Sequence, residues 1–521
     1  MYPTPTVPPV MKIELLSHGF VVSDFDARAK VAVVDFARSM AEYHFVKVSR
    51  DQFERKVLRV FASYTSDRLI WRFHANQFND FMRHLAGYGW SSDQIQITRR
   101  APYVAQDCTH PLKDGMVPFD YQEPLIDYVL GPCPEHFAPS KILTLQTGKG
   151  KSLTTLFAIS RAGKRVMLVV RGKYVDKWVM DINEAFDYNP GDLIVVRGTK
   201  DLTRLMNAAL DDTLTAKFII TTTTTWYKYM HVHELANGNS ELVYAVPPDR
   251  FYETLKIGIR NTDEVHEDFH CNFRHDLYTH TLLTNSMSAT MEPESPFLAK
   301  MYDLMFPAET RGPEVEYDKY ISLAVLWYSI NEPSRIRCMG PRGYNHIQFE
   351  ESMIRNRTML KNYFDMHVAI IHREFASVFE PGQSALVLFS TIEMARLFQP
   401  YLKEKLPQLE VQRYVRGLDD GYEENFQKGD VVVSTYKSAG TAVDRRNLRV
   451  TFRSMWLSSK QGNIQALGRT RRLKDWPDVT PRFICISARE IPKHRDYTRA
   501  LFSKLDGKVL ASHEMQTSYR V

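Results

Sequence analysis

The chain has 521 residues, 44% hydrophobic and 12% aromatic, and is therefore long enough to form two to four domains with buried cores. Its 67 Lys and Arg residues nearly balance 61 Asp and Glu residues, and the net charge of +6 permits a polyanionic partner without arguing for one. The five cysteines form no CxxC pair, which argues against a zinc ribbon or a disulfide framework, and no apolar run approaches the about 18–20 residues of a membrane span. We therefore expect a globular cytoplasmic protein that does not associate with membranes.

The first part of the chain predicts a tail and a small mixed domain. Residues 1–10 are rich in proline and predict a disordered tail. Residues 11–110 combine short strands with two amphipathic segments, at 26–43 and 75–90, whose apolar residues recur every three to four positions. Strands are expected in MKIELLS, FVVSD, DQIQITRR and, as a pair, within ERKVLRVFASYTSDRLIWRFH. This region therefore predicts an α+β accessory domain.

Basic residues in the accessory domain admit two interpretations. The segments SRDQFERKVLRV and QIQITRR contain several arginines, and Arg99 and Arg100 fall near the start of the next domain. A basic rim of this kind would bind duplex phosphates without sequence specificity. A solvated surface is the simpler interpretation of the same residues. DNA binding by this domain is thus one of two expectations.

Two regions of alternating strands and helices follow. From residue 116 the apolar segments KILTL, RVMLVV, DLIVV, AKFIITT and LKIGI alternate with helical stretches, which indicates a parallel sheet covered on both faces. The pattern restarts with a long helix near 347–378 and the segments SALVLFS, GDVVVSTY, VTFRSMWLS and RFICISA. The expected fold class is α/β, with two parallel-sheet domains in tandem. Their predicted bounds are 116–312 and 346–521, joined by a strand-like insert at 313–345.

The segment LQTGKGKS interrupts an apolar strand with a polar turn. Gly148 and Gly150 allow backbone N–H groups to face an anion, Lys151 supplies a charge, and Ser152 supplies a hydroxyl for Mg²⁺. A helix expected to start at Ser152 adds the positive end of its dipole. Read alone, the same letters also fit a basic surface turn. In its context after a strand, the segment predicts a phosphate-binding loop.

Acidic residues follow a later strand. In LKIGIRNTDEVHEDFH, Asp263 is placed to hold Mg²⁺ through water and Glu264 to orient an attacking water. A solvated acidic turn is the alternative interpretation. The preceding strand favours the metal and water chemistry.

Arginines near the end of the chain form the last part of the pattern. In QALGRTRRLKD, Gln465, Arg469 and Arg472 stand at positions i, i+4 and i+7, which predicts one helix face whose donors converge on a triphosphate. The alternative is a solvated helix face rich in arginine.

Taken in order, these segments resemble the motifs of superfamily 2 helicases and translocases. The series comprises DYQEPLIDYVL, TGKGKS, VVRGKYVDKW, TTTTTW, DEVH and SAT, then LVLFSTIEMARLF, VVSTYKSAGTAVD and QALGRTRR, and it covers about residues 116–490. The resemblance implies two RecA-like domains that close on ATP. Departures occur at Leu145, where the family usually has Gly or Ala, in VRGKY, and at Asn261 and Thr262.

The resemblance also implies a role for each matching residue. ATP would be bound through Gln122, Thr147, Gly148, Lys149, Gly150, Lys151, Ser152, Gly440 and Asp444, and Mg²⁺ through Ser152 and Asp263. Catalysis would involve Lys151, Asp263, Glu264, Gln465, Arg469 and Arg472. Nucleotide state would be coupled to nucleic acid through His266, Ser288, Ala289 and Thr290, and nucleic acid would be contacted by Arg171, Thr224, Thr225, Ser390 and Thr435. For the threonines, a β-branched strand end is the alternative reading.

The expected function is an ATP-dependent DNA helicase or translocase. A compact core with a small N-terminal α+β domain resembles the UvsW-like phage helicases, which act on branched DNA in recombination and fork repair, and this implies a host-cytoplasm location and single-stranded, duplex or branched DNA as the partner. An RNA helicase or transcript-release ATPase is the alternative, because backbone contacts distinguish the two sugars poorly. A nucleotide-gated binding module without hydrolysis is the non-enzyme alternative.

Overall fold

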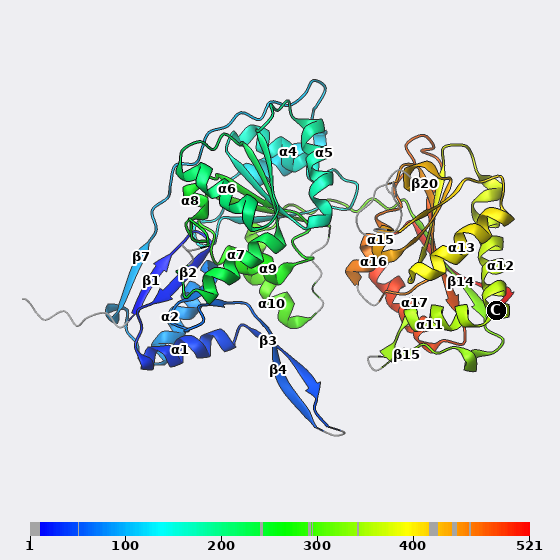
Figure 1. Ribbon diagram of the computed structural model, residues 1–521, viewed down its shortest axis with the longest axis horizontal. Helices are drawn as coiled ribbons and strands as arrows, with labels where there is room; N and C mark the ends of the chain where they lie inside the picture. Colours follow the sequence, from blue (N-terminus) through cyan, green and yellow to red (C-terminus); the bar gives the residue numbers. More distant parts are fainter. Residues whose placement is uncertain are drawn as a thin grey trace, which may run out of the picture. The chain divides into compact units, whose positions relative to one another are not determined.

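The computed structural model describes most of the chain in two units (Figure 1). The described residues are 11–49, 52–239, 243–289, 293, 295–340, 343–415, 426–439, 445–457 and 460–521. The predicted tail at 1–10 and three site candidates, Thr290, Gly440 and Asp444, lie outside them. The first unit comprises Met1–Leu145 and Gly150–Glu314, and the second comprises Gln146–Lys149 and Val315–Val521. Within the described part of the chain, no helix is long and apolar enough to cross a membrane.

The first unit begins with a five-stranded mixed sheet in the order β5-β6-β2-β1-β7. Its strands are β1 (Met11–Leu15), β2 (Gly19–Ser23), β5 (Ser63–Tyr64), β6 (Trp71–His74) and β7 (Ile95–Arg99). Helices α1 (Ala27–Arg38) and α2 (Phe78–Gly87) pack on this sheet through an aromatic core that includes Phe20, Phe36, Phe73 and Phe81. The helix predicted at 26–43 is shorter than expected, because the chain enters strand β3 at Ala41.

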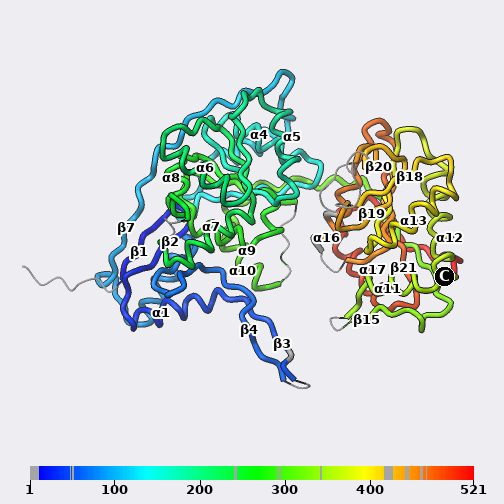
Figure 2. Tube along the Cα trace, viewed as in Figure 1, coloured from blue at the N-terminus to red at the C-terminus, as the bar shows by residue number. Residues whose placement is uncertain are grey.

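Strands β3 (Ala41–Lys47) and β4 (Phe53–Val60) form a separate antiparallel ribbon. The ribbon follows α1 in the chain and projects from the rest of the first unit, as the trace in Figure 2 also shows. Its eight-residue strand β4 is almost entirely exposed.

The first unit continues with a six-stranded parallel sheet in the order β10-β11-β9-β12-β13-β8. Its strands are β8 (Ser140–Thr144), β9 (Val166–Val170), β10 (Leu193–Val196), β11 (Phe218–Thr222), β12 (Ile259–Thr262) and β13 (Leu283–Ser288). Every residue of β9 and β11 is buried. Because successive side chains of a strand point to opposite faces, both faces of this sheet are covered, as the sequence predicts.

Helices precede, connect and follow the strands of this sheet. They are α3 (Glu123–Leu130), α4 (Lys151–Ala162), α5 (Val175–Ala185), α6 (Thr199–Leu210), α7 (Thr223–Leu235), α8 (Phe251–Thr254), α9 (Phe269–Asp276) and α10 (Pro296–Met305). Short 3₁₀ turns in both units lie at Ala75–Gln77, Ser92–Gln94, Asp120–Gln122, Gly172–Tyr174, Ala308–Thr310, Pro333–Arg335 and Ala376–Val378.

Strand β12 differs from the expectation. The sequence predicts a strand in the apolar segment LKIGI, but the strand runs over Ile259–Thr262 and contains three polar residues that are all buried. These side chains are accommodated by partners from elsewhere in the unit: Arg260 pairs with Asp276, and Asn261 accepts a hydrogen bond of 3.3 Å from Asn285.

The second unit contains a seven-stranded parallel sheet in the order β18-β19-β17-β20-β21-β14-β22. Its strands are β14 (Ser322–Ser329), β17 (Ser384–Phe389), β18 (Val411–Tyr414), β19 (Val431–Thr435), β20 (Leu448–Arg453), β21 (Arg482–Ala488) and β22 (Ala511–Arg520), and a small hairpin joins β15 (Met339–Gly340) to β16 (Gly343–Tyr344). The predicted connecting insert at 313–345 contains β14, which pairs with two strands of this sheet. That segment is therefore part of the second sheet rather than a separate insert.

Helices of the second unit are α11 (His346–Arg355), α12 (Arg357–Glu374), α13 (Ile392–Lys405), α15 (Tyr436–Ala439), α16 (Lys460–Leu467) and α17 (Pro492–Leu505). The long helix predicted near 347–378 is two helices, because Asn356 leaves the helical conformation and its side chain caps α12 by accepting from the Met359 N–H. The two parallel sheets confirm the predicted fold class, in which two tandem RecA-like α/β domains follow a small α+β domain.

Candidate nucleotide-binding site

A glycine turn joins strand β8 to helix α4. Gly148 and Gly150 have φ values of 91° and 70°, in the left-handed region that glycine adopts without strain. Gly150 is the N-cap of α4, and the helix begins at Lys151, one residue earlier than the sequence suggests. The first backbone N–H groups of α4 have no partner within the helix, so this turn has the local form of an anion-binding site.

Gln122 lies directly behind this turn. The buried side chain accepts from the Phe119 N–H at 3.0 Å and donates to the Thr154 hydroxyl at 3.0 Å and to the Gly150 carbonyl at 3.4 Å. A Cβ atom at Gly150 would lie 2.8 Å from the Gln122 amide nitrogen. In this structure Gln122 therefore holds the turn and the start of α4, and its amide is engaged within the protein.

Asp263 and Glu264 lie just beyond strand β12. The Asp263 carboxylate accepts from Trp178 Nε1 at 2.8 Å and from the Glu264 N–H at 2.9 Å. Trp178 follows Lys177, whose Nζ is 3.4 Å from the Ser152 hydroxyl, so α5 links the two residues predicted to bind Mg²⁺.

The two carboxylates differ in their ionisation. Burial, reinforced by the neighbouring Glu264, raises the pKa of Asp263 to about 6. Burial also opposes the ionisation of Glu264, but Lys151 and His266 outweigh it, and the pKa of Glu264 is lowered. Lys151 Nζ lies 3.4 Å from Glu264 Oε1, and both side chains are largely buried. The pair thus presents an ionised carboxylate beside a carboxyl group that is easily protonated.

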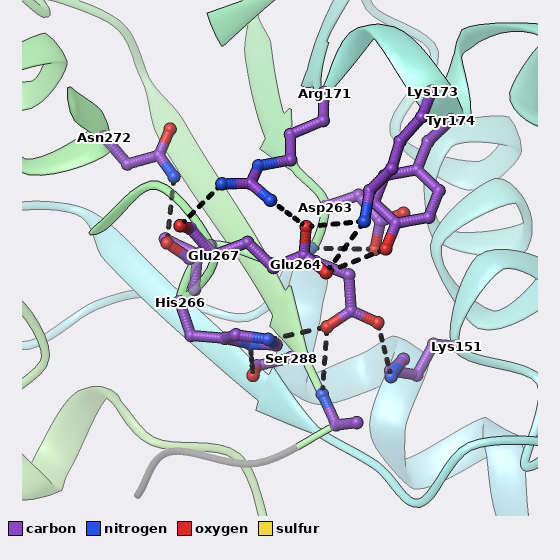
Figure 3. Close-up of polar contacts among 12 residues, drawn as sticks. Lys151, Arg171, Lys173, Tyr174, Asp263, Glu264, His266, Glu267, Asn272 and Ser288 are labelled. Carbon is purple, nitrogen blue, oxygen red and sulfur yellow. Dashed lines mark hydrogen bonds and ion pairs between the residues drawn. The ribbon is translucent and has the colours of Figure 1, made fainter. Parts of the chain in front are cut away.

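Glu264 also contacts the residues predicted to couple the site to nucleic acid (Figure 3). Its second oxygen lies 3.4 Å from the Ala289 N–H and 3.4 Å from His266 Nδ1. His266 Nδ1 in turn lies 2.5 Å from the Ser288 hydroxyl, at the end of strand β13. Lys151, Glu264, His266, Ser288 and Ala289 therefore form one connected group at the carboxyl edge of the parallel sheet.

Arg171 does not present a free guanidinium. Its Nη1 donates to the Glu267 carboxylate at 2.7 Å and its Nη2 to the Glu267 carbonyl at 2.9 Å (Figure 3). The Asp268 carboxylate accepts from Nε at 2.7 Å and from Nη2 as well. The hydrogen bonds to Asp268 raise the pKa of Arg171, and burial opposes them only in part. Arg171 therefore fixes the turn that follows Glu264, and its contact with nucleic acid stays a prediction.

The threonine run starts helix α7. Thr222 caps the helix by accepting from the Thr225 N–H at 3.2 Å. Thr225 is buried, and its hydroxyl accepts from the Gly198 N–H at 3.0 Å. Thr224 is exposed, with its hydroxyl 3.1 Å from Thr222 Oγ1. Of the two predicted phosphate contacts, Thr225 thus has a structural partner, whereas Thr224 faces solvent.

Several predicted residues belong to the second unit. Residues 146–149 are part of it, and Gln146 exchanges two hydrogen bonds with the backbone of Asp318, at 2.8 and 3.1 Å. The Asp318 carboxylate also lies 3.6 Å from Lys149 Nζ. Thr147 packs close to Gly468, with its Cβ 2.8 Å from the position a Gly468 Cβ would take.

The predicted arginine helix is interrupted. Helix α16 ends at Leu467, so Gln465 is helical but Arg469 and Arg472 lie beyond the helix, and the prediction of one shared helix face is wrong. Gly468 follows the last helical residue, and the buried Thr470 hydroxyl bonds to Thr451 of β20 at 2.8 Å, which draws this segment toward the sheet. The Arg472 guanidinium pairs with Asp318 at 2.7 and 3.1 Å.

Ser390 and Thr435 follow two strands of the second sheet. The Ser390 N–H donates to buried Glu350 at 2.7 Å, and Ser390 lines a cavity of about 350 Å³ with Tyr344 and His346. The Thr435 hydroxyl is buried and donates to Ser438 at 3.0 Å. Ser390 thus borders open space, whereas Thr435 caps a short helix.

Three contributors to the site escaped the sequence reasoning: Trp178, Glu267 and Asp268. Trp178 holds Asp263, and the two acids hold Arg171. A signal was present in the sequence, since VRGKYVDKW contains both the arginine and the tryptophan and DEVHED contains both acids. Nothing in these segments indicates that they pair with each other.

The two parallel sheets and the glycine turn define a protein of two RecA-like parallel-sheet domains. No family model and no curated protein matches the chain. The chain is similar to S. cerevisiae Dbp5 bound to RNA and ADP BeF3, with 12% identity over 77% of this chain and 90% of that chain and a TM-score of 0.48. It is also similar to T4 UvsW, with 11% identity over 97% of this chain and 99% of that chain and a TM-score of 0.32. At these scores the function must be argued from the residues of this chain.

Proposed function

We propose that the protein is an ATP-dependent helicase or translocase that remodels branched or forked DNA. The observation that carries the proposal is the connected group of Lys151, Glu264, His266 and Ser288 beside the glycine turn. A strand-to-helix turn with two left-handed glycines suits a phosphate chain, and a lysine with an adjacent ionised carboxylate suits phosphoryl transfer to water. DNA as the substrate rests on the size of the chain and on its layout, a compact core preceded by a small N-terminal α+β domain, which resembles the UvsW-like helicases.

The chain also has donors that fit Mg²⁺. Mg²⁺ is commonly held by one or two carboxylates together with substrate phosphates and waters, so a dedicated protein cage is unnecessary. The Asp263 carboxylate and the Ser152 hydroxyl supply oxygen atoms, the ligand type that Mg²⁺ prefers. Within the described residues, no group of three or more His, Cys, Asp or Glu is placed to hold a metal. When bound, the ion would supply charge stabilisation to the phosphate oxygens. The burial that raises the pKa of Asp263 also favours a compensating cation there.

The residues of the chain divide the work as follows. Lys151 would bind the terminal phosphates, and its contact with Glu264 would be exchanged for the nucleotide. Glu264, ionised and held by the Ala289 N–H, would orient a water and accept its proton. His266 and Ser288 connect this carboxylate to the end of strand β13, and a change at Glu264 would be passed to that strand end through these contacts.

The test is steady-state ATPase with no nucleic acid, single-stranded DNA, duplex DNA, a four-way DNA junction, or RNA. We expect the junction to stimulate most, Lys151→Ala to be inactive, and Glu264→Gln to bind ATP while turnover falls by about 100-fold or more, as for loss of a general base. Lys200→Ala, an exposed lysine on α6, is the matched control and should behave like the parent protein. Turnover of Glu264→Gln within a few-fold of the parent would refute the proposed role. Stimulation by RNA alone would replace DNA by RNA as the substrate.

A further inference from the structure

The β3–β4 ribbon has two chemically different faces. Paired residues of an antiparallel ribbon share a face, and the register pairs Tyr43 with Val57 and Phe45 with Arg55. Phe53 stands two residues before Arg55 and lies on the same face. The side chains on this face are therefore mainly aromatic and cationic.

The opposite face has a different composition. It pairs His44 with Lys56 and Val46 with Glu54, and Lys56 forms an ion pair with Glu54 at 3.3 Å. One face of the ribbon is therefore apolar and basic, and the other carries balanced charge.

The aromatic face is open to solvent. Phe45, Phe53 and Val57 are 71%, 63% and 51% exposed, which is unusual for large apolar side chains that are neighbours in a sheet. The Arg55 guanidinium lies 3.7 Å from the centroid of the Tyr43 ring, so a cation is stacked on an aromatic surface at the same place.

These features fit a single nucleic-acid strand better than an apolar protein partner. The exposed Phe45 ring offers a surface on which an unpaired base can stack, and Arg55, opposite Phe45 in the register, places a cation beside that base. Residues 41–60 contain five Lys and Arg residues against three Asp and Glu, which gives the ribbon the charge that phosphates require. Aromatic rings interleaved with cations are the usual means of binding single strands without sequence preference.

The base of the ribbon is attached close to the candidate site. The Val60 carbonyl accepts from His270 Nε2 at 2.7 Å, and the Phe61 ring lies 5.1 Å from the Phe273 ring in an edge-on packing. Both partners belong to α9, the helix that follows the turn of Glu264 and Asp268. A nucleic-acid strand bound to the ribbon would thus contact an element that packs on α9, the helix directly after the turn that contains Glu264.

We propose that the face formed by Tyr43, Phe45, Phe53 and Arg55 binds single-stranded nucleic acid, with the rings stacking on unpaired bases and Arg55 contacting phosphate. The inference rests on the proposed function, because it names the substrate surface of the same enzyme. Duplex DNA, whose bases are already stacked, would gain nothing from the rings.

The experiment measures binding of a fluorescent 20-nucleotide oligo(dT) by anisotropy, without ATP. Phe45→Ala and Arg55→Ala are compared with Val46→Ala and Lys56→Ala, which remove similar groups from the other face of the same ribbon. We expect Phe45→Ala to weaken binding at least about fivefold, the lower limit for loss of one stacked base, and both controls to stay within about twofold. For Arg55→Ala we expect weaker binding and a salt dependence reduced by about 0.7 in log–log slope, the value for one phosphate of a single strand.

The outcomes separate this inference from the proposed function. Equal binding by all four variants and the parent would overturn the inference and leave the ribbon to a protein partner. Equal weakening toward a blunt 20-base-pair duplex would also overturn it, since stacking on unpaired bases would not be the cause. Absence of any Lys151-dependent ATPase, with selective loss of oligo(dT) binding in Phe45→Ala, would refute the enzyme and support the binding surface.

Discussion

A buried ion pair in the first unit offers a quantitative test of how the N-terminal sheet is attached. Arg260 of β12 and Asp276 at the end of α9 are 1% and 0% exposed, and they contact each other directly. Asp276 also lies 3.4 Å from His74 Nε2 of the N-terminal strand β6, and Arg260 donates to the Thr279 hydroxyl at 2.7 Å. Burial raises the pKa of Asp276, but Arg260 and His74 outweigh this effect and lower it far below its usual value.

Asp276→Asn keeps the volume of the side chain and removes its charge. Arg260 then remains buried without a counter-ion, which costs about 3–5 kcal/mol in free energy of unfolding. For a unit of this size, each kcal/mol lost in free energy of unfolding lowers the midpoint temperature of thermal unfolding by about 2 °C, so this midpoint should fall by roughly 6–10 °C. Because the folded pKa of Asp276 is depressed, this stability is present at neutral pH and is lost only as the pH falls below the unfolded value of 3.8.

Thermal unfolding followed by circular dichroism at pH 7 measures this shift. Asp80→Asn is the matched control, because Asp80 pairs with Arg83 on the surface of α2 and its loss should leave the midpoint unchanged. Combining Asp276→Leu with Arg260→Met should recover part of the loss, since both charges are then removed together. An Asp276→Asn midpoint no lower than that of the control would refute the assigned strength of this pair.

Two further changes have defined outcomes. Burial raises the pKa of Glu350 to about 7 although hydrogen bonds oppose it, so the folded protein retains a proton that the unfolded chain releases near pH 4.5. The free energy of unfolding should therefore fall by about 3 kcal/mol between pH 4.5 and 7, and denaturant titrations of Glu350→Gln should lack this decrease. Arg171→Ala should lower ATP turnover on the order of tenfold with little change in nucleic-acid affinity, because Arg171 holds Glu267; exposed Arg197→Ala is the control. Lower nucleic-acid affinity with normal ATP turnover would contradict this assignment and support the predicted contact of Arg171 with nucleic acid.

The sequence predicts the parallel sheets well where strands are continuous apolar runs. β9 and β11 consist of residues that are buried on both faces, so apolar content and the absence of alternation were sufficient evidence. The glycine turn was predictable for a related reason, since Gly148 and Gly150 adopt backbone angles that few other residues accept. In these elements the local sequence and the final environment require the same residue types.

The failures occur where a distant partner decides the local structure. Arg260, Asn261 and Thr262 form a buried strand because Asp276 and Asn285 receive two of these side chains, and neither partner is near them in sequence. Helix α16 ends before Arg469 because Thr470 bonds to the neighbouring strand β20. Spacing along a chain predicts a helix face only while the helix continues, and tertiary hydrogen bonds determined where this one ends.

The backbone of Glu264 is the clearest case in which the site, rather than local preference, determines conformation. Its φ is 45°, a left-handed value that costs a non-glycine residue about 1–2 kcal/mol. The turn is maintained by the Asp263 carboxylate, which accepts from the Glu264 N–H, and by the Glu267 N–H, which donates to the Glu264 carbonyl at 2.8 Å. Arg171 in turn holds Glu267. The same turn directs the Glu264 carboxylate toward Lys151 and the Ala289 N–H, so the residues that maintain the strained backbone also place the carboxylate where hydrolysis would require it.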